Sequence, residues 1–161
     1  MAIGDIRVLD AGAFGQIGAK LCNVAAGAST IYPGEPVVRA LGGVTVTAMA
    51  TSKPAVGTDY VVGIATSTST QTASSAGIVY VQPAVSGVIY AIKPNTAASW
   101  DTQAEYDALV GKRVLIDLTS SSYTILASDS TNNGCVVEAI DISKFPGTVA
   151  FSIRRGCTDL A

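Results

Sequence analysis

The chain of 161 residues is long enough for one domain, or for one domain with an arm, and it can bury a core without disulfides or metals. Its formal net charge of −2 excludes a protein that binds nucleic acid by neutralising phosphates, because such a protein needs a basic surface. The chain contains no histidine and only 14% charged residues. The lack of histidine removes most general-base, zinc and Ser–His or Cys–His mechanisms, so we predict a protein that is not an enzyme.

The first thirty residues differ from the rest, because glycines interrupt every candidate element. Their apolar residues show no sustained helical or strand periodicity; these residues are Ile3, Ile6, Val8, Leu9, Phe14, Ile17 and Leu21. One interpretation is a frayed terminus with a single short strand. The other, which we favour, is an extended N-terminal arm over residues 1–30 that buries these side chains on a neighbouring subunit. Residues 31–161 then form a single β-rich domain.

From residue 31 the pattern changes to short β-like runs separated by turns. Pro33-Gly34-Glu35-Pro36 is typical of a turn, because proline presets φ and glycine permits a positive φ. Residues 44–49 alternate, so Val44, Val46 and Ala48 are expected to share the buried face of a strand. Further strands are predicted at 37–41, 59–66, 78–81, 85–92, 113–119, 123–126, 135–142 and 148–154. The uncharged Ser/Thr-rich stretch 67–75 is predicted to be an exposed loop.

One short α-helix is predicted at about residues 102–110. Thr102 and Glu105 have the spacing of a capping box, in which each side chain satisfies a free amide at the start of the helix. A helix of this length is unstable alone and must dock on the β core. Trp100, just before it, is either an anchor for the helix or an interface hot spot. Together the elements predict an antiparallel β-sandwich or barrel with one short helix and an N-terminal arm.

No group of residues has the spacing of a catalytic, metal or cofactor site, and we predict none of the three. Cys22, Cys135 and Cys157 are few and far apart, which indicates buried thiols, although Cys135 and Cys157 could approach one another. The adjacent Arg154 and Arg155 are expected to pair with a carboxylate or with a neighbouring chain. No signal peptide and no membrane span are expected.

Several stretches resemble the head decoration, or capsid cement, proteins of tailed bacteriophages. They are the Gly34-Glu-Pro-Val entry into the β region, Tyr60-Val-Val-Gly-Ile-Ala-Thr-Ser-Thr-Ser-Thr, Ile78-Val-Tyr-Val-Gln-Pro, Gly87-Val-Ile-Tyr, and Ser99-Trp-Asp-Thr-Gln-Ala-Glu-Tyr-Asp-Ala-Leu-Val-Gly-Lys-Arg-Val. The resemblance covers roughly residues 31–155. The glycine-rich start of this chain is longer than in the most compact members of the family.

The resemblance implies a structural virion protein, made in the host cytoplasm, that stabilises the capsid after expansion. Its partners would be the major capsid protein and itself, as a homotrimer on the outer capsid surface, with neither nucleic acid nor membrane bound. The family has no catalytic residues, so none is carried over. The candidate interface residues are the seven apolar residues of the arm together with Trp100, Arg154 and Arg155. The alternatives are another virion part, such as a tail or fibre component, and a receptor- or carbohydrate-binding β module.

Overall fold

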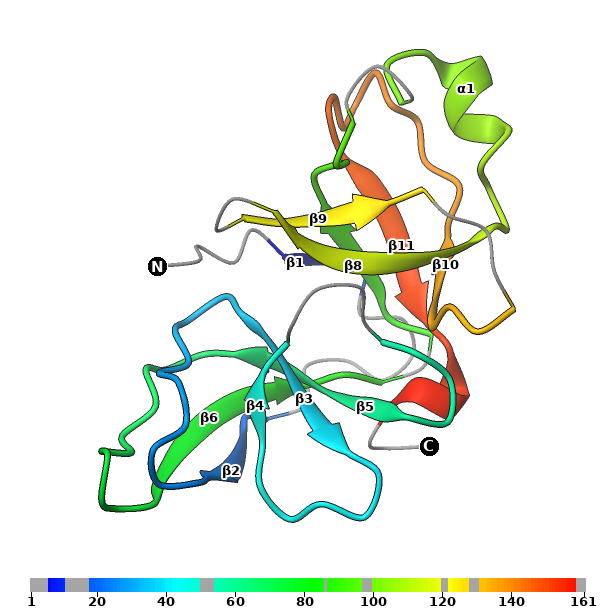
Figure 1. Ribbon diagram of the computed structural model, residues 1–161. Helices are drawn as coiled ribbons and strands as arrows, with labels where there is room; N and C mark the ends of the chain where they lie inside the picture. The colour runs from blue at the N-terminus through cyan, green and yellow to red at the C-terminus, as the bar shows by residue number, and fades with distance from the viewer. Residues whose placement is uncertain are drawn as a thin grey trace.

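The computed structural model describes residues 6–10, 18–49, 54–85, 87–96, 100–119, 122–127 and 131–158. Within these residues the chain is mainly β, with two antiparallel sheets and one short α-helix, which confirms the predicted fold class. The sheets form two lobes, an upper and a lower one in the view of Figure 1. The architecture is sandwich-like, since no continuous ladder closes a barrel among the described residues. In the same residues, no helix is both long enough and apolar enough to cross a membrane.

The upper lobe contains a six-stranded sheet and the helix α1 (Gln103–Asp107). In their order across the sheet, the strands are β1 (Arg7–Asp10), β7 (Ile89–Ile92), β11 (Val149–Ile153), β10 (Cys135–Val137), β8 (Arg113–Thr119) and β9 (Ser122–Leu126). The last strand, β9, returns toward the segment after β7. There Ile125 N–H donates to the Lys93 carbonyl, and Asn95 N–H donates to the Ile125 carbonyl.

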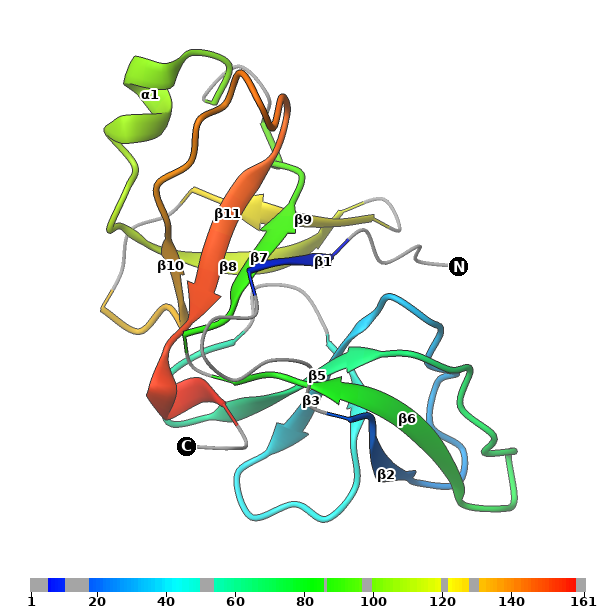
Figure 2. The same ribbon diagram turned by 180° about the vertical axis from the view of Figure 1, so that it is seen from behind.

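The lower lobe contains a five-stranded sheet. Its strands, in order across the sheet, are β2 (Lys20–Val24), β6 (Gly77–Pro83), β5 (Asp59–Ala65), β3 (Pro36–Ala40) and β4 (Thr47–Ala48). A single parallel bridge between Val24 and Val46 joins the two ends of this sheet. The first described strand, β1, therefore lies in the upper lobe, β2 to β6 build the lower lobe, and the strands from β7 onward lie in the upper lobe again (Figures 1 and 2).

The core consists of two clusters of buried apolar side chains. The smaller cluster lies inside the lower lobe and is built mostly from valines, among them Val24, Val37 and Val79. The larger cluster fills the upper lobe and also includes Val38 and Val61 of the lower-lobe sheet. Because neighbouring residues on β3 and β5 join different clusters, these strands are buried on both faces. The larger cluster therefore joins the two lobes by burying apolar surface from both.

The first thirty residues are integrated into the fold where the structure describes them. β1 pairs with β7 in one sheet, and β2 pairs with β6 in the other (Figure 2). Ile6 is buried in the larger cluster, and Cys22 is buried in the smaller one. These residues therefore form strands of both sheets rather than the predicted extended arm, because both backbone pairing and apolar burial are available within their own chain.

The predicted strand at 44–49 is much shorter than expected. Only Thr47 and Ala48 pair, as β4 with β3. Val46 is buried as predicted, but Val44 is 82% exposed in the loop before the strand. The turn at residues 41–42 places Val44 outside the sheet, so the alternation of residues 44–48 does not reflect one strand face.

The helix α1 has the predicted capping box but is shorter than predicted, ending at Asp107. Its buried Tyr106 fixes it to the sheet: the hydroxyl donates to the Glu138 carbonyl (2.8 Å) and accepts from Ala150 N–H (2.9 Å). Burial raises the pKa of Tyr106 to about 12, so the hydroxyl stays protonated and keeps both bonds near neutral pH.

We expect Tyr106→Phe to lower the free energy of unfolding by about 1–3 kcal/mol, because it leaves the Ala150 N–H and the Glu138 carbonyl without this partner. Urea denaturation followed by circular dichroism measures the change. The matched control is Tyr80→Phe, whose exposed ring should tolerate the change within about 0.5 kcal/mol. Equal stability of the two variants would show that the buried hydroxyl contributes nothing.

Candidate functional site

The loop between β3 and β4 exposes two apolar side chains at the end of the lower lobe. Leu41 is 61% exposed and Val44 is 82% exposed. Between them, Gly42 adopts a φ of 76°, which turns the chain and directs the loop outward. In Figure 1 this loop is the lowest part of the molecule. Two large exposed apolar side chains on one loop can contribute to a contact surface, so we treat this loop as a candidate one.

A second exposed apolar pair lies on the outer face of the same lobe. Leu21 of β2 stands directly opposite Tyr80 of β6, and both side chains are about half exposed. Residues opposite one another on antiparallel strands have side chains in contact range. The residues Leu21, Leu41, Val44 and Tyr80 are named here the lower-lobe surface.

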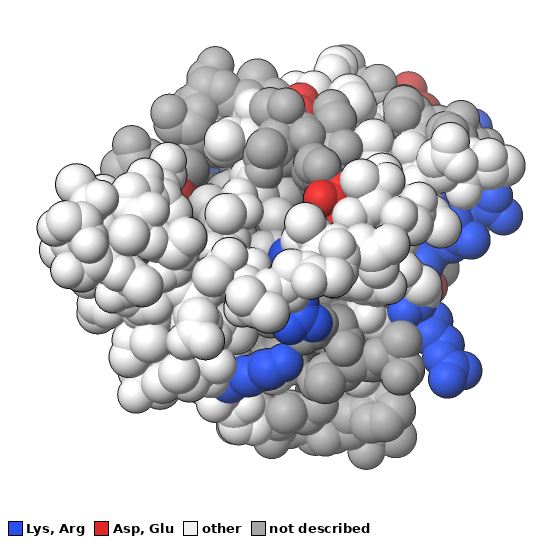
Figure 3. Space-filling model, turned by 60° about the horizontal axis from the view of Figure 1, so that its bottom comes forward, with Lys and Arg blue, Asp and Glu red and all other residues white. Residues whose placement is uncertain are grey.

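Few charged side chains accompany the lower-lobe surface. Within residues 18–49 and 54–85 the charged residues are Lys20, Glu35, Arg39 and Asp59, and the two carboxylates among them are buried. Figure 3 shows this end of the molecule with a broad area that is neither acidic nor basic, and with Lys and Arg side chains near the middle of the view and along its right edge. Depletion of charge around apolar side chains is characteristic of the centre of protein–protein interfaces.

The Ser/Thr-rich loop beside this surface is ordered by its own hydroxyl groups. Ser67 Oγ accepts from Tyr80 N–H (3.0 Å), and Thr70 Oγ1 accepts from Ile78 N–H (3.0 Å). Ser69 is buried, and its Oγ accepts from Ile31 N–H (2.8 Å). The loop is therefore exposed over most of its length, as predicted, but its hydroxyls attach it to β6 and to the segment before β3.

A groove of about 440 Å³ opens where the two lobes meet. One wall consists of residues 28–30, Tyr32 and Glu35, the second of residues 47–49, and the third of Leu118 and Tyr123 from β8 and β9. Tyr123 donates its hydroxyl hydrogen to the Met49 carbonyl (2.9 Å), which links β9 to the lower lobe across the groove. This groove is called the inter-lobe groove below.

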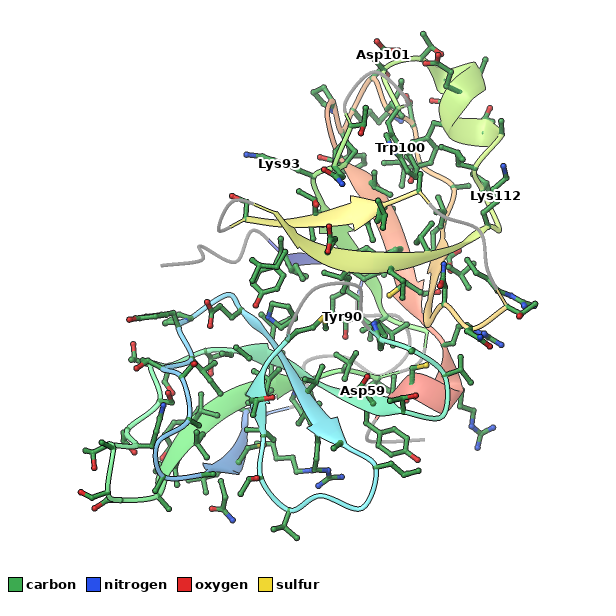
Figure 4. The ribbon with its side chains drawn as sticks, in the orientation of Figure 1. Asp59, Tyr90, Lys93, Trp100, Asp101 and Lys112 are labelled. Carbon is green, nitrogen blue, oxygen red and sulfur yellow. The ribbon has the colours of Figure 1, made fainter. Side chains whose placement is uncertain are left out.

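A smaller groove of about 270 Å³ lies in the upper lobe near α1. It is lined by Pro94, Trp100, Asp101, Ile142, Pro146 and Gly147. Figure 4 shows Trp100 within the upper lobe and Asp101 at its outer end. Hydrogen bonding between Asp101 and Glu105 raises the pKa of Asp101 and lowers that of Glu105. Both carboxyl groups are exposed, so neither is a buried acid.

The predicted apolar interface residues are separated by the structure. Ile6 is buried in the core and Leu21 lies on the lower-lobe surface. Val8 and Leu9 are part of β1, although their side chains lie outside the described residues. Ile3, Phe14 and Ile17 lie outside the described residues altogether. Of the described side chains in this set, Leu21 alone has the exposure that an interface role requires.

Trp100, Arg154 and Arg155 occupy three different environments. Trp100 is buried at 4% exposure and packs edge-on against Tyr106, which favours its role as a helix anchor. Arg154 donates through Nη1 to the carbonyls of Thr131 and Asn133, and these hydrogen bonds stabilise the loop before β10. Arg155 is exposed at the start of the 3₁₀ helix η3 (Arg155–Cys157). The structure therefore does not bring these three residues together into one site.

The three cysteines are free and buried. Burial raises the pKa of each thiol, most strongly for Cys135. In the part of the chain that the structure describes, no group of three or more His, Cys, Asp or Glu side chains could hold a metal ion.

The sequence analysis missed Leu41, Val44 and Tyr80 as interface candidates. Leu41 and Val44 flank Gly42-Gly43, and a glycine pair between apolar residues is a signal for a turn that exposes its neighbours. Tyr80 carries no such signal, because an aromatic residue in a strand run is equally consistent with burial.

Comparison of the chain with protein-family models gives no match, and comparison with curated proteins gives none either.

Proposed function

We propose that this protein is a structural component of a phage virion that binds the outside of the expanded capsid and bridges neighbouring major capsid subunits. Its partners in this role are the major capsid protein and further copies of itself, as a homotrimer. It acts without catalysis. The proposal combines the resemblance of residues 31–155 to capsid cement proteins with the lower-lobe surface, and the lower-lobe surface is the structural observation that carries it.

The lower-lobe surface supports the proposal because its chemistry suits a permanent protein contact. Leu41 and Val44 stand at the end of a lobe with few charged side chains around them. Burying apolar side chains against a partner stabilises a complex by about 25 cal/mol per Å² of apolar surface. A lobe that ends in such a loop can reach a depression between capsid subunits while the upper lobe remains available for sister copies.

Binding of this kind stabilises a capsid by mass action. A protein that binds the assembled lattice but not its disrupted form adds about 2.7 kcal/mol per site when its free concentration is a hundred times Kd. Contacts to two or three subunits at once raise the effective affinity further. Modest contacts therefore suffice, since they are repeated over the whole lattice.

The test is co-sedimentation of the protein with expanded, undecorated heads of its source phage. We expect saturable binding at a fixed ratio to the major capsid protein. The double variant Leu41→Asp/Val44→Asp should bind at least tenfold more weakly, which corresponds to about 1.4 kcal/mol or more. Its stability should change little, because both side chains are exposed.

The matched control is Val110→Asp, a change of the same kind at a partly exposed site of the upper lobe. It should leave head binding unchanged. Equal binding of the double variant and the wild type would contradict the role of the lower-lobe surface. Failure of the wild type to bind heads, with assembly into rings or attachment to tails or glycans, would contradict the decoration function and favour one of the alternatives.

A further inference from the structure

Two segments that are distant in the sequence pair with each other and link the two lobes. Residues 54–56 lie before β5 of the lower lobe, and residues 132–134 lie before β10 of the upper lobe. At the centre of the pairing, Ala55 and Asn133 form an antiparallel bridge. Backbone hydrogen bonds on both sides of this bridge complete the pairing. The two paired segments are called the lobe bridge below.

Asn133 is the one asparagine of the chain that precedes a glycine. Such a pair can lose its side-chain amide with no reactant other than water. The Gly134 nitrogen attacks Cγ of Asn133, because no Cβ atom on the attacking residue hinders the approach. The nitrogen gives up its proton and forms a bond to Cγ, the Cγ–Nδ2 bond breaks, and ammonia leaves. Water then opens the resulting cyclic imide to an aspartate or an isoaspartate residue.

In the folded chain, both reacting groups are engaged by other partners. Gly134 N–H donates to the Pro54 carbonyl (2.9 Å), so the nitrogen keeps its proton while the lobe bridge is closed. The Asn133 side chain is buried, and its Nδ2 donates to the Arg113 carbonyl (2.9 Å). The Asn133 carbonyl accepts from Arg154 Nη1 (3.2 Å). The reaction therefore requires that the lobe bridge first opens.

The packing of the lobe bridge explains why this reactive pair is present. A Cβ atom at Gly134 would lie 2.6 Å from Pro54 Cγ and 2.8 Å from Cys157 Sγ, so a larger residue does not fit there. Asn133 supplies the donor for the Arg113 carbonyl, which an aspartate, as an acceptor, could not supply. The closed lobe bridge thus needs both residues, and together they are reactive once it opens.

We propose that Asn133-Gly134 is a deamidation site that is protected while the lobe bridge is closed and that reacts when it opens. The product has a carboxylate at position 133, which cannot donate to the Arg113 carbonyl and is unfavourable to bury. The isoaspartate product also adds a methylene group to the main chain within the pairing. Deamidation therefore makes a reversible opening permanent. The inference is independent of head binding, because neither the site nor its test involves a capsid.

The test compares the folded full chain with the same chain in concentrated urea, at one mildly alkaline pH and one temperature. Peptide mapping by mass spectrometry follows the conversion of Asn133, and the ammonia released provides a second readout. We expect the folded chain to react at least a hundredfold more slowly, which corresponds to an opening free energy of about 2.8 kcal/mol or more. Asn95, which is exposed and precedes threonine, is the internal reference and should react slowly in both states. Equal rates at Asn133 in the two states, or no reaction in urea, would overturn the proposal.

Two neighbouring arginines separate the closure of the lobe bridge from the chemistry. Arg154→Ala removes the hydrogen bond to the Asn133 carbonyl and should speed the reaction of the folded chain about tenfold, with no change in urea. Arg155→Ala is the matched control, because this side chain is exposed, and it should leave both rates unchanged. Equal rates for the two folded variants would contradict protection by the lobe bridge.

Asn133→Asp reproduces the charge of the product and tests whether the opening becomes permanent. At neutral pH we expect this variant to unfold at a lower urea concentration than the wild type. The difference should shrink at acid pH, because a protonated carboxyl group can again donate to the Arg113 carbonyl. A urea midpoint equal to that of the wild type at neutral pH would show that the closed lobe bridge tolerates the product, and would contradict this part of the proposal.

Discussion

We expect Gly63→Ala to prevent stable folding, with a loss of more than about 4 kcal/mol in the free energy of unfolding. Gly63 lies in β5 between β3 and β6, opposite Val37 on one side and Pro83 on the other. A Cβ atom at this position would overlap the Gln82 carbonyl oxygen and lie 2.7 Å from both the Gln82 carbonyl carbon and Val81 Cγ1. The overlap involves backbone of a central strand pair, which cannot move without separating β5 from β6.

The loss would be a large fraction of the total stability of a domain of this kind, which is about 5–15 kcal/mol. The yield of soluble protein and the dispersion of its amide NMR signals measure the effect. Gly156→Ala is the matched control, because a Cβ there meets no atom within 4 Å and the change should cost about 1 kcal/mol or less. A soluble Gly63→Ala protein with wild-type stability would show that β5 and β6 are not paired in this register.

We expect Trp100→Ala to lower the free energy of unfolding by about 3–5 kcal/mol. The indole ring is buried in the larger apolar cluster, and its centre lies 5.7 Å from that of Tyr106 at an interplanar angle of 64°. Such an edge-to-face pair contributes about 0.5–1.5 kcal/mol beyond the apolar area that it buries. Removing the indole leaves a cavity beneath α1 and takes away the contact that holds the helix on the sheet.

Urea denaturation followed by circular dichroism measures this loss, since Trp100 is the sole tryptophan and fluorescence disappears with it. Trp100→Phe keeps an aromatic ring beside Tyr106 and should lose clearly less stability than the alanine variant. An unchanged denaturation curve for Trp100→Ala, together with weakened assembly, would instead identify Trp100 as an interface residue.

Local patterns allowed much of the fold to be predicted. The strands at 59–65, 113–119 and 122–126 lie within a residue of their predicted positions, because each is a compact β-branched or aromatic run between turn residues. The capping box of Thr102 and Glu105 is present as the spacing indicated. These features depend on residues close together in the chain.

The candidate surfaces were less accessible to prediction. The inter-lobe groove combines the turn at Glu35 with Met49 and with Leu118 of β8, and no pattern in the sequence relates these segments. The alternating run predicts that Val44 is buried, but β4 begins only at Thr47, so Val44 is exposed in the loop before it. Whether a side chain is exposed depends on which strand lies next to its own strand. The neighbouring strand is determined only when segments that are distant in the sequence pair.

The sequence by itself determined the β-rich class, the turns, the helix start and the low charge of the chain. Only the tertiary structure decided which strand joined which sheet, and so where β1 and β2 lie and where the two lobes meet. The physical reason is that strands pair through backbone groups that are the same in every residue. Periodicity shows that a strand has a face to bury, while the choice of partner depends on the packing of the whole chain.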